Sequence, residues 1–283
     1  MGGVLVIVGT PLGNREDLSP RARAAILGAD LLLCEDTRSP NRLFGEGVTL
    51  PPRRSCFVGN EHARTAELLE ALAAGKRVAY VSEAGMPCWS DPGERIVRAA
   101  IDAGYEVDVV PGPTAAATAV ALSGLPSAEV RFVGFPPRSG RARTEFFDDL
   151  RHESATVVCY EAGNRTRELV VDLAAAIEDA SARRVVVARE LTKLHQEVRR
   201  GTAASLAAEL PDALLGEVTV VIGPSTTTRH DVAESAARDV LEIMLDATLR
   251  PRERARRLAA RTGHPARELY ARLGIAPADD GDG

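Results

Sequence analysis

Cysteine is scarce in this chain, and its few cysteines are far apart. The 283 residues include four cysteines, and no two of them form a Cys-x-x-Cys pair. Such pairs are typical of zinc sites and of redox-active disulfides. The five histidines form no His-Glu-x-x-His pattern, which is the spacing of a zinc protease. We therefore expect reduced thiols and no metal site. The cysteines are Cys34, Cys56, Cys88 and Cys159.

Long apolar runs are also missing near the N-terminus. The first run, Val4–Val8, is followed at once by Gly9. A membrane helix needs about 20 apolar residues, and a secretory signal needs an apolar region of about 7–15. The sequence therefore predicts a cytoplasmic protein that does not enter a membrane.

Lysine is almost absent, so arginine carries nearly all the positive charge. Lys76 and Lys193 are the only lysines among 35 lysine and arginine residues. Arginine pairs well with phosphate, but a coding bias in an alanine- and arginine-rich proteome explains the same pattern, and we favour that explanation. The net charge of −5 excludes a generally basic nucleic-acid coat, so any RNA contact must be local.

Several nucleotide and nucleophile motifs do not occur. The chain has no Gly-x-Gly-x-x-Gly fingerprint, no Gly-Lys-Ser/Thr phosphate loop and no Gly-x-Ser-x-Gly turn. Sites for dinucleotides and triphosphates, and the serine nucleophile of an α/β-hydrolase, therefore have little support.

The residues that are present alternate between short apolar runs and helical stretches. This rhythm predicts an α/β protein with two α/β domains, at residues 1–112 and 113–224, the first with a mostly parallel sheet and the second with a mixed one. The helices of the first domain are expected at 21–27, 65–74 and 94–103. The predicted strands are Val4–Val8, Leu31–Cys34, Arg77–Val81 and 107–110 in the first domain, and 130–134, 156–160, 185–188, 197–200 and 218–222 in the second.

Three loops that follow strands of the first domain are rich in glycine and proline. They are Gly9-Thr-Pro-Leu-Gly-Asn14, Ser82-Glu-Ala-Gly-Met-Pro87 and Pro111-Gly-Pro-Thr114. Ligands of open α/β sheets bind beyond the carboxyl ends of the strands, so three such loops favour a ligand cleft over simple tight turns. Helix starts follow them: Ser19-Pro20 and Asp91-Pro-Gly-Glu94 each combine a capping residue with a proline at the first helical position.

Charged clusters follow other strands. They are Cys34-Glu-Asp-Thr-Arg38, Tyr160-Glu161 and Arg189-Glu-Leu-Thr-Lys193. Each is either functional or part of an ion-pair network between domains, and the sequence leaves both possibilities open.

A third, helical region follows a polar linker at 225–230. Helices are expected at 232–245, 251–262 and 265–273, within a C-terminal basic helical domain at 231–275. The segment from Arg250 to Arg272 contains eight arginines and two glutamates, and this local charge of +6 suits an RNA contact. The alternative is a solvated helical face balanced by Asp279, Asp280 and Asp282.

Five segments in this order resemble the tetrapyrrole methylase superfamily. They are Gly9-Thr-Pro-Leu-Gly-Asn14, Glu35-Asp-Thr-Arg38, Ser90-Asp-Pro-Gly93, Pro111-Gly-Pro113 and Ala188-Arg-Glu-Leu-Thr-Lys193. Within that superfamily the chain is similar to the branch of the ribosomal RNA small-subunit methyltransferases I, over residues 4–274. That branch methylates the ribose 2′-hydroxyl of a cytidine in 16S rRNA with S-adenosylmethionine.

The resemblance implies two α/β domains with the cofactor between them, a homodimer, and the small ribosomal subunit as partner. It carries the cofactor site onto Pro11, Leu12, Gly13, Ser82, Glu83, Ala84, Gly85, Thr114, Ala115, Tyr160, Glu161 and Leu191. The ribose hydroxyl is a poor nucleophile, so a general base would help. Glu35, Asp36 and Glu61 are the candidates for that base, and Arg38 and Lys193 could hold a phosphate.

The chain departs from the family pattern at Gly59, Glu83, Met86 and Asn164. Three alternatives therefore remain. They are a methylase of a tetrapyrrole or another small molecule, an RNA methyltransferase with a different nucleotide, and a non-catalytic nucleic-acid-binding protein that senses the cofactor. Removal of 231–283 is expected to abolish RNA modification but to spare turnover of a small molecule.

Overall fold

A computed structural model describes residues 2–45, 47–226 and 229–272. The described residues up to 224, apart from 152–154, form one compact unit, and residues 152–154 belong with those from 225 onward to a second. Among the described helices none is both long enough and apolar enough to cross a membrane. The three-domain division of the chain stays a prediction.

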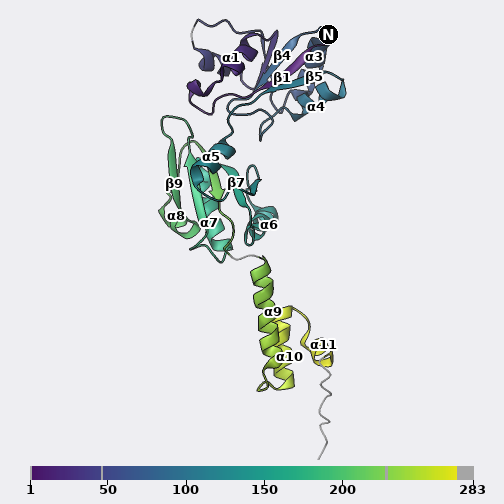
Figure 1. The fold of residues 1–283 in the computed structure, drawn as a ribbon, viewed down its shortest axis with the longest axis vertical. Coiled ribbons are helices and arrows are strands. Elements are labelled where there is room, and N and C mark those ends of the chain that lie inside the picture. The colour runs from purple at the N-terminus through teal and green to yellow at the C-terminus, as the bar shows by residue number, and fades with distance from the viewer. Residues whose placement is uncertain (1, 46, 227–228, 273–283) are drawn as a thin grey trace, which may run out of the picture. The chain divides into compact units, whose positions relative to one another are not determined.

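The first sheet is parallel throughout and has helices on both faces (Figure 1). Its strand order is β3-β2-β4-β1-β5. The strands are β1 (Val4–Val8), β2 (Leu31–Cys34), β3 (Arg53–Ser55), β4 (Arg77–Val81) and β5 (Glu106–Val110). Its helices are η1 (Arg15–Asp17), α1 (Pro20–Leu27), α2 (Ser39–Phe44), α3 (Glu61–Ala73) and α4 (Glu94–Asp102).

Both faces of this sheet are apolar because both are covered. Alternate residues of a strand point to opposite faces. Leu31 and Leu33 of β2 pack in the core under α3 and α4, whereas Leu32 and Cys34 pack in the core under α1. This explains why β2 is a continuous apolar run, as is usual in a parallel sheet.

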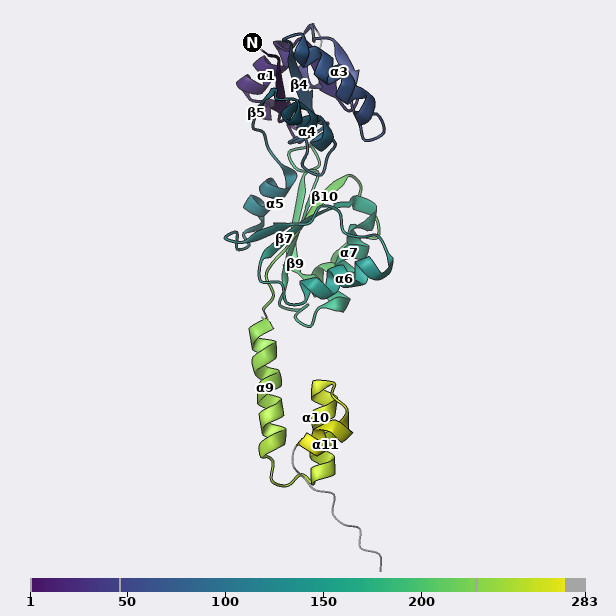
Figure 2. The same cartoon turned by 90° about the vertical axis from the view of Figure 1, so that its right-hand side faces the viewer.

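The second sheet is mixed, as predicted. Its order is β6-β7-β10-β8-β9, and only the β6–β7 pair is parallel. Figure 2 shows α5 (Ala115–Ser123) on one side of it and α6 (Gly140–Leu150) and α7 (Gly163–Ala176) on the other. The remaining elements are β6 (Val130–Phe132), β7 (Thr156–Ala162), β8 (Arg184–Arg189), β9 (Glu197–Thr202), α8 (Ala203–Glu209) and β10 (Glu217–Ile222).

The predicted strands are all present, with boundaries that differ by up to two residues. Strand β3 was not predicted, because Arg-Arg-Ser has no apolar residue and lies on the edge of its sheet. Helix α2 was not predicted either, no ranges were predicted for α5–α8, and α3 begins at Glu61 instead of at residue 65. The predicted cap at Ser19 is confirmed, since its side chain accepts a hydrogen bond from the backbone N–H of Ala22.

The second compact unit is helical. It contains α9 (Arg229–Leu245), α10 (Pro251–Thr262) and α11 (Ala266–Arg272), and α10 packs against both of the others (Figure 2). Gly263 ends α10 with a φ of 71°, a conformation that suits glycine. The predicted linker at 225–230 is too long, because α9 begins at Arg229. Residues 273–275 of the predicted domain and its three C-terminal aspartates lie outside the described residues.

Candidate functional site

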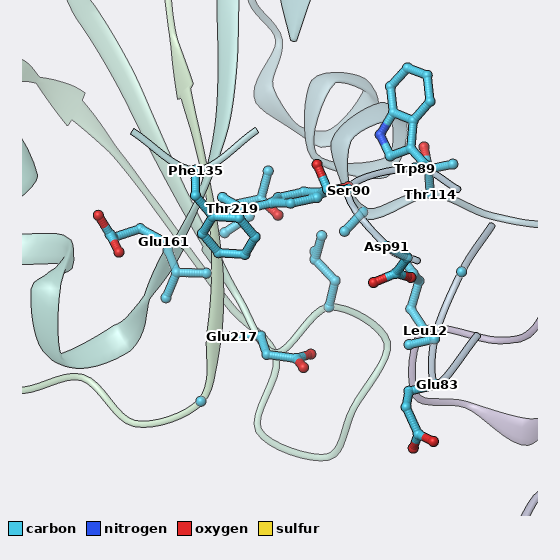
Figure 3. Close-up of a pocket in the computed structure, with 18 of the residues that line it drawn as sticks. Leu12, Glu83, Trp89, Ser90, Asp91, Thr114, Phe135, Glu161, Glu217 and Thr219 are labelled. Atoms are coloured by element: carbon cyan, nitrogen blue, oxygen red, sulfur yellow. The ribbon is translucent and has the colours of Figure 1, made fainter. Parts of the chain in front are cut away.

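A cavity of about 370 Å³ lies where the first sheet's loops meet the second sheet. The loops after β1, β4 and β5 contribute Leu12, residues 83–91 and Thr114. Strands β7, β8 and β10 contribute side chains from the other side. Cavities of about 300–1,000 Å³ hold small ligands, so this one has the size for a single cofactor. Figure 3 shows its lining.

Nine of the twelve predicted cofactor residues line this cavity. They are Leu12, Glu83, Ala84, Gly85, Thr114, Ala115, Tyr160, Glu161 and Leu191. Pro11 and Ser82 line a smaller neighbouring cavity of about 40 Å³. Gly13 packs against Lys193, and a Cβ on Gly13 would lie 2.3 Å from the Lys193 Cγ. The structure thus gathers most of the predicted set in one place, and the cofactor role of each residue stays a prediction.

Backbone contacts hold the cavity loops together. Thr10 and Gly85 exchange two backbone hydrogen bonds, with N···O distances of 2.8 and 3.1 Å, which tie the loop after β1 to the loop after β4. Gly9 and Gly112 pass so closely that a Cβ on Gly9 would lie 2.6 Å from the Gly112 Cα. Glycine is required at this point because two segments of the backbone approach each other closely.

Gly9→Ala is therefore expected to destabilise the protein by about 1–3 kcal/mol, the usual range for overpacking. The measurement is the free energy of unfolding from a urea titration. Gly2→Ala is the matched control, because its Cβ would meet Tyr105 at an ordinary 3.6 Å. Equal unfolding free energies for the two variants would contradict the expectation.

Asp91 lines the cavity and was not among the predicted site residues. Burial raises the pKa of its carboxyl from 3.8 to about 6; Glu35 adds to the rise, and a hydrogen bond from Ser82 opposes it. A carboxylate with a pKa near neutrality can accept a proton at physiological pH. Asp91 is therefore a candidate proton acceptor at the cavity.

The predicted helix cap at Asp91 is wrong. Helix α4 begins at Glu94, and its N-cap is Gly93, whose φ of 126° only glycine adopts readily. The N–H of Gly93 donates to the Glu61 carboxylate at 2.8 Å. Because Glu61 satisfies this donor, Asp91 is not used as the cap and belongs to the cavity instead. The sequence signal for Asp91 was its place in the Ser90-Asp-Pro-Gly93 segment.

None of the five predicted catalytic residues is among those that line the cavity: Glu35, Asp36, Arg38, Glu61 and Lys193. The Arg38 guanidinium donates hydrogen bonds to Asp36 and lowers the pKa of that carboxyl to about 2. Burial, together with nearby Glu83, raises the pKa of Glu35. The catalytic roles of these five residues stay predictions.

Lys193 belongs to an ion-pair cluster beside the cavity. Its Nζ lies 3.0 Å from Glu190 Oε1 and 2.9 Å from Glu217 Oε2. Glu217 itself lines the cavity. All three residues lie in the second predicted domain, so these ion pairs do not form the network between domains that the sequence left open as an alternative to a functional role.

Two of the departures from the family pattern have structural partners. Glu83 accepts hydrogen bonds from the Asp36 N–H and from the Ser39 hydroxyl, so it holds the turn that leads into α2. The Met86 sulfur accepts the N–H of Gly112 at 3.2 Å. Both residues support the loops around the cavity.

Tyr160 and Glu161 add polar groups to the lining. The Tyr160 hydroxyl accepts hydrogen bonds from the Ala116 N–H and from the Trp89 indole N–H. With these two acceptor positions taken, its own hydrogen remains available to a ligand. The Glu161 side chain is 3% exposed, and its Oε2 has no hydrogen-bond partner within the described part of the chain. Arg165 lies 3.7 Å from the other oxygen of this carboxylate, and in Figure 3 the Glu161 side chain is directed away from the centre of the cavity.

Four aromatic rings connect the two sheets beside the cavity. Trp89 stacks on Phe132 with a centroid distance of 4.9 Å and an angle of 22° between the ring planes. Tyr160 meets the rings of Phe132 and Phe135 edge to face, at 4.9 and 5.7 Å. Trp89, Phe135 and Tyr160 line the cavity. Trp89, Phe132 and Phe135 were not among the site residues predicted from sequence.

Comparison with known proteins shows which family the chain resembles. The family of Tetrapyrrole (Corrin/Porphyrin) Methylases matches residues 4–207. A protein of Synechocystis sp. called ribosomal RNA small subunit methyltransferase I is 37% identical over 95% of this chain and 96% of its own length. Proteins of the same name from Thermotoga maritima and Mycobacterium tuberculosis are 42% and 38% identical; the former covers 78% of this chain and 98% of its own length, the latter 95% and 93%.

Solved structures with the same fold are more distant in sequence. The methyltransferase CobJ has a TM-score of 0.59 and 22% identity over 81% of this chain and 97% of its own. Uroporphyrin-III-C-methyltransferase from Thermus thermophilus has a TM-score of 0.54 and 21% identity, over 78% and 94%. At this level of identity the likeness concerns the fold alone.

Proposed function

The chain belongs to the tetrapyrrole methylase family, and on that premise we propose that it methylates the ribose 2′-hydroxyl of a cytidine in 16S rRNA of the small ribosomal subunit. It is a methyltransferase with S-adenosylmethionine as methyl donor. The observation that carries the proposal is the cavity that holds Asp91 next to most of the predicted cofactor residues. A homodimer and a cytoplasmic location stay predictions.

The residues present fit this donor. The cavity has room for one small ligand, and Gly85 in its lining has no side chain to fill that room. Asp91, Thr114 and Tyr160 supply polar groups in its lining, which the polar and charged parts of the donor require. When bound, the donor supplies a methyl group on a positively charged sulfur.

Asp91 supplies the general base in this proposal. Its carboxylate would accept the proton of the ribose hydroxyl as that oxygen bonds to the methyl group, which the bound donor would supply by breaking its carbon–sulfur bond and keeping the electron pair. Glu61 acts as a positioning residue, since its contact with the Gly93 N–H shapes the turn that carries Asp91.

The basic helices support an RNA substrate rather than a small molecule. Arg250, Arg252, Arg256, Arg267 and Arg272 are exposed and have no ion-pair partner among the described residues. Arg257 and Arg261 pair with Glu253 and Asp239, and Arg254 donates to backbone carbonyls of its own unit. Unpaired arginines can bind phosphates without first breaking an ion pair.

The test is transfer of a tritiated methyl group from S-adenosylmethionine to small ribosomal subunits that lack the modification. We expect label in 16S rRNA and, after nuclease digestion, a cytidine whose added mass stays with the ribose. Label on another nucleotide would favour the second alternative above. No label on subunits, with label on a tetrapyrrole, would favour the first; cofactor binding without any transfer would favour the regulator.

A further inference from the structure

Trp89 lines the cavity and stacks on another ring, yet it remains 45% exposed. One face of its indole is stacked on Phe132, and its N–H donates to the Tyr160 hydroxyl. A tryptophan that served only to join the two sheets would be expected to bury most of its surface. Part of this ring is therefore available to a ligand at the mouth of the cavity.

The backbone around Trp89 is strained. Cys88 and Ser90, on either side of it, have φ values of 67° and 58°. Residues other than glycine rarely adopt this region, and such strain persists only where the surrounding structure enforces it.

Phe135 provides a second open ring. It lines the cavity, is 62% exposed, and meets only the edge of Tyr160 among the rings described. In Figure 3, Phe135 and Trp89 lie across the upper part of the cavity, and Glu83 and Glu217 lie across the lower part. The cavity thus has exposed aromatic rings on one side, whereas its other lining residues include the buried Leu12, Ala188 and Leu191.

We propose that Trp89 and Phe135 form a stacking platform for one unpaired nucleobase of the RNA substrate. This inference rests on the proposed function and names the part of the site that receives the nucleotide. A ribose hydroxyl can reach a donor inside a cavity only if its nucleotide leaves the stacked helix. Aromatic rings replace the lost base stacking, and they do so in proteins that bind single-stranded nucleic acid.

The size of the cavity indicates that the two rings receive a base of the RNA rather than the adenine of the donor. The cavity of about 370 Å³ is at the lower end of the range for small ligands, so the donor takes up its interior. A nucleotide must then lie at the mouth, where the two exposed rings are. The experiment separates these two occupants.

The chain contains one tryptophan, so its indole emission reports on Trp89 alone. The protein is first saturated with S-adenosylhomocysteine and then titrated with a single-stranded oligocytidylate, whose binding is followed in parallel by the anisotropy of an end label. We expect quenching that follows binding, and none with a duplex of equal length. The proposal would be overturned if the oligonucleotide bound to saturation without quenching the emission. It would also be overturned if S-adenosylhomocysteine alone already produced the full quenching.

Variants provide a second readout that does not depend on emission. Phe135→Ala and Trp89→Leu are expected to raise the KM for small ribosomal subunits about ten-fold, the usual effect of losing one base stack. Trp89→Phe should keep most of the affinity, and Ile101→Ala is the control for loss of an exposed apolar side chain elsewhere. The affinity for S-adenosylhomocysteine should not change in any of them.

The two proposals fail in different ways. If the wild-type protein methylates subunits but Phe135→Ala and Trp89→Leu do so with unchanged KM, the stacking platform is wrong and the proposed function stands. If the wild type transfers no methyl group to subunits, the proposed function fails. Thermal unfolding of each variant checks that it is folded, and Phe135 is exposed enough for its removal to leave the core intact.

Discussion

Asp91→Asn is expected to lower the rate of methyl transfer by about 10²–10⁴-fold, the range that general-base catalysis contributes. The amide keeps the shape of the side chain but cannot accept the proton. Single-turnover transfer of tritiated methyl groups to small ribosomal subunits measures the effect. The affinity for S-adenosylhomocysteine, measured by calorimetry, should stay nearly the same, because the variant removes a proton acceptor rather than a wall of the cavity.

The pH dependence follows from the raised pKa of Asp91. The base works only when it is ionised, so the wild-type rate should fall as the pH drops below about 6. Stability has the opposite dependence. Because the folded pKa exceeds the unfolded value of 3.8, folding disfavours the ionised form, and stability falls as the pH rises from about 4 through about 6. Asp91→Asn should therefore leave the Tm at pH 8 unchanged or raise it.

Asp102→Asn, at the exposed end of α4, is the matched control and should leave transfer unchanged. Glu61→Gln should give a smaller loss than Asp91→Asn, since Glu61 acts through the turn at Gly93. If Asp91→Asn kept full activity while Glu61→Gln, Asp36→Ala or Glu35→Gln lost most of it, the general base would be one of the residues predicted from sequence.

Truncation after Thr226 is expected to raise the KM for small ribosomal subunits by about 10²–10³-fold, because it removes the five unpaired arginines. The rate at saturating subunits and the affinity for S-adenosylhomocysteine should change little, since the cavity lies in the first compact unit. The T. maritima relative matches 98% of its own length to 78% of this chain, so a protein of that name is shorter than this one. Because the cavity lies in the first compact unit, we expect a loss of affinity and not the complete loss of RNA modification that the sequence alone suggested.

A smaller change tests the same contact within the intact chain. Arg252→Ala combined with Arg256→Ala should lower the slope of log K against log salt for RNA binding by about 2, one for each phosphate contact. Arg77→Ala combined with Arg184→Ala is the control, because both residues are exposed and lie at the starts of β4 and β8. Equal slopes for the two double variants would show that the basic helices do not bind the RNA backbone.

The apolar pattern was enough to predict most of the fold. Continuous burial of β2 appears in the sequence as Leu31–Cys34, because a strand covered on both faces must be apolar at every position. The cap at Ser19 was equally local, since a capping side chain bonds to the backbone a few residues away. Strand β3 could not be found in this way, because its place depends on pairing with β2 rather than on its own residues.

The sequence by itself thus determined every strand except β3, the main helices of the first domain and of the C-terminal region, and the loops that surround the cavity, since periodicity, capping and glycine content are properties of neighbouring residues. Only the tertiary structure decided which charged groups are free. It paired Asp36 with Arg38 and Lys193 with Glu190 and Glu217, and it left Asp91 in the cavity with a raised pKa. It also placed Trp89 on Phe132, a ring more than forty positions along the chain. Ion pairing, burial and stacking depend on distances between segments far apart in sequence, and those distances exist only in the folded chain.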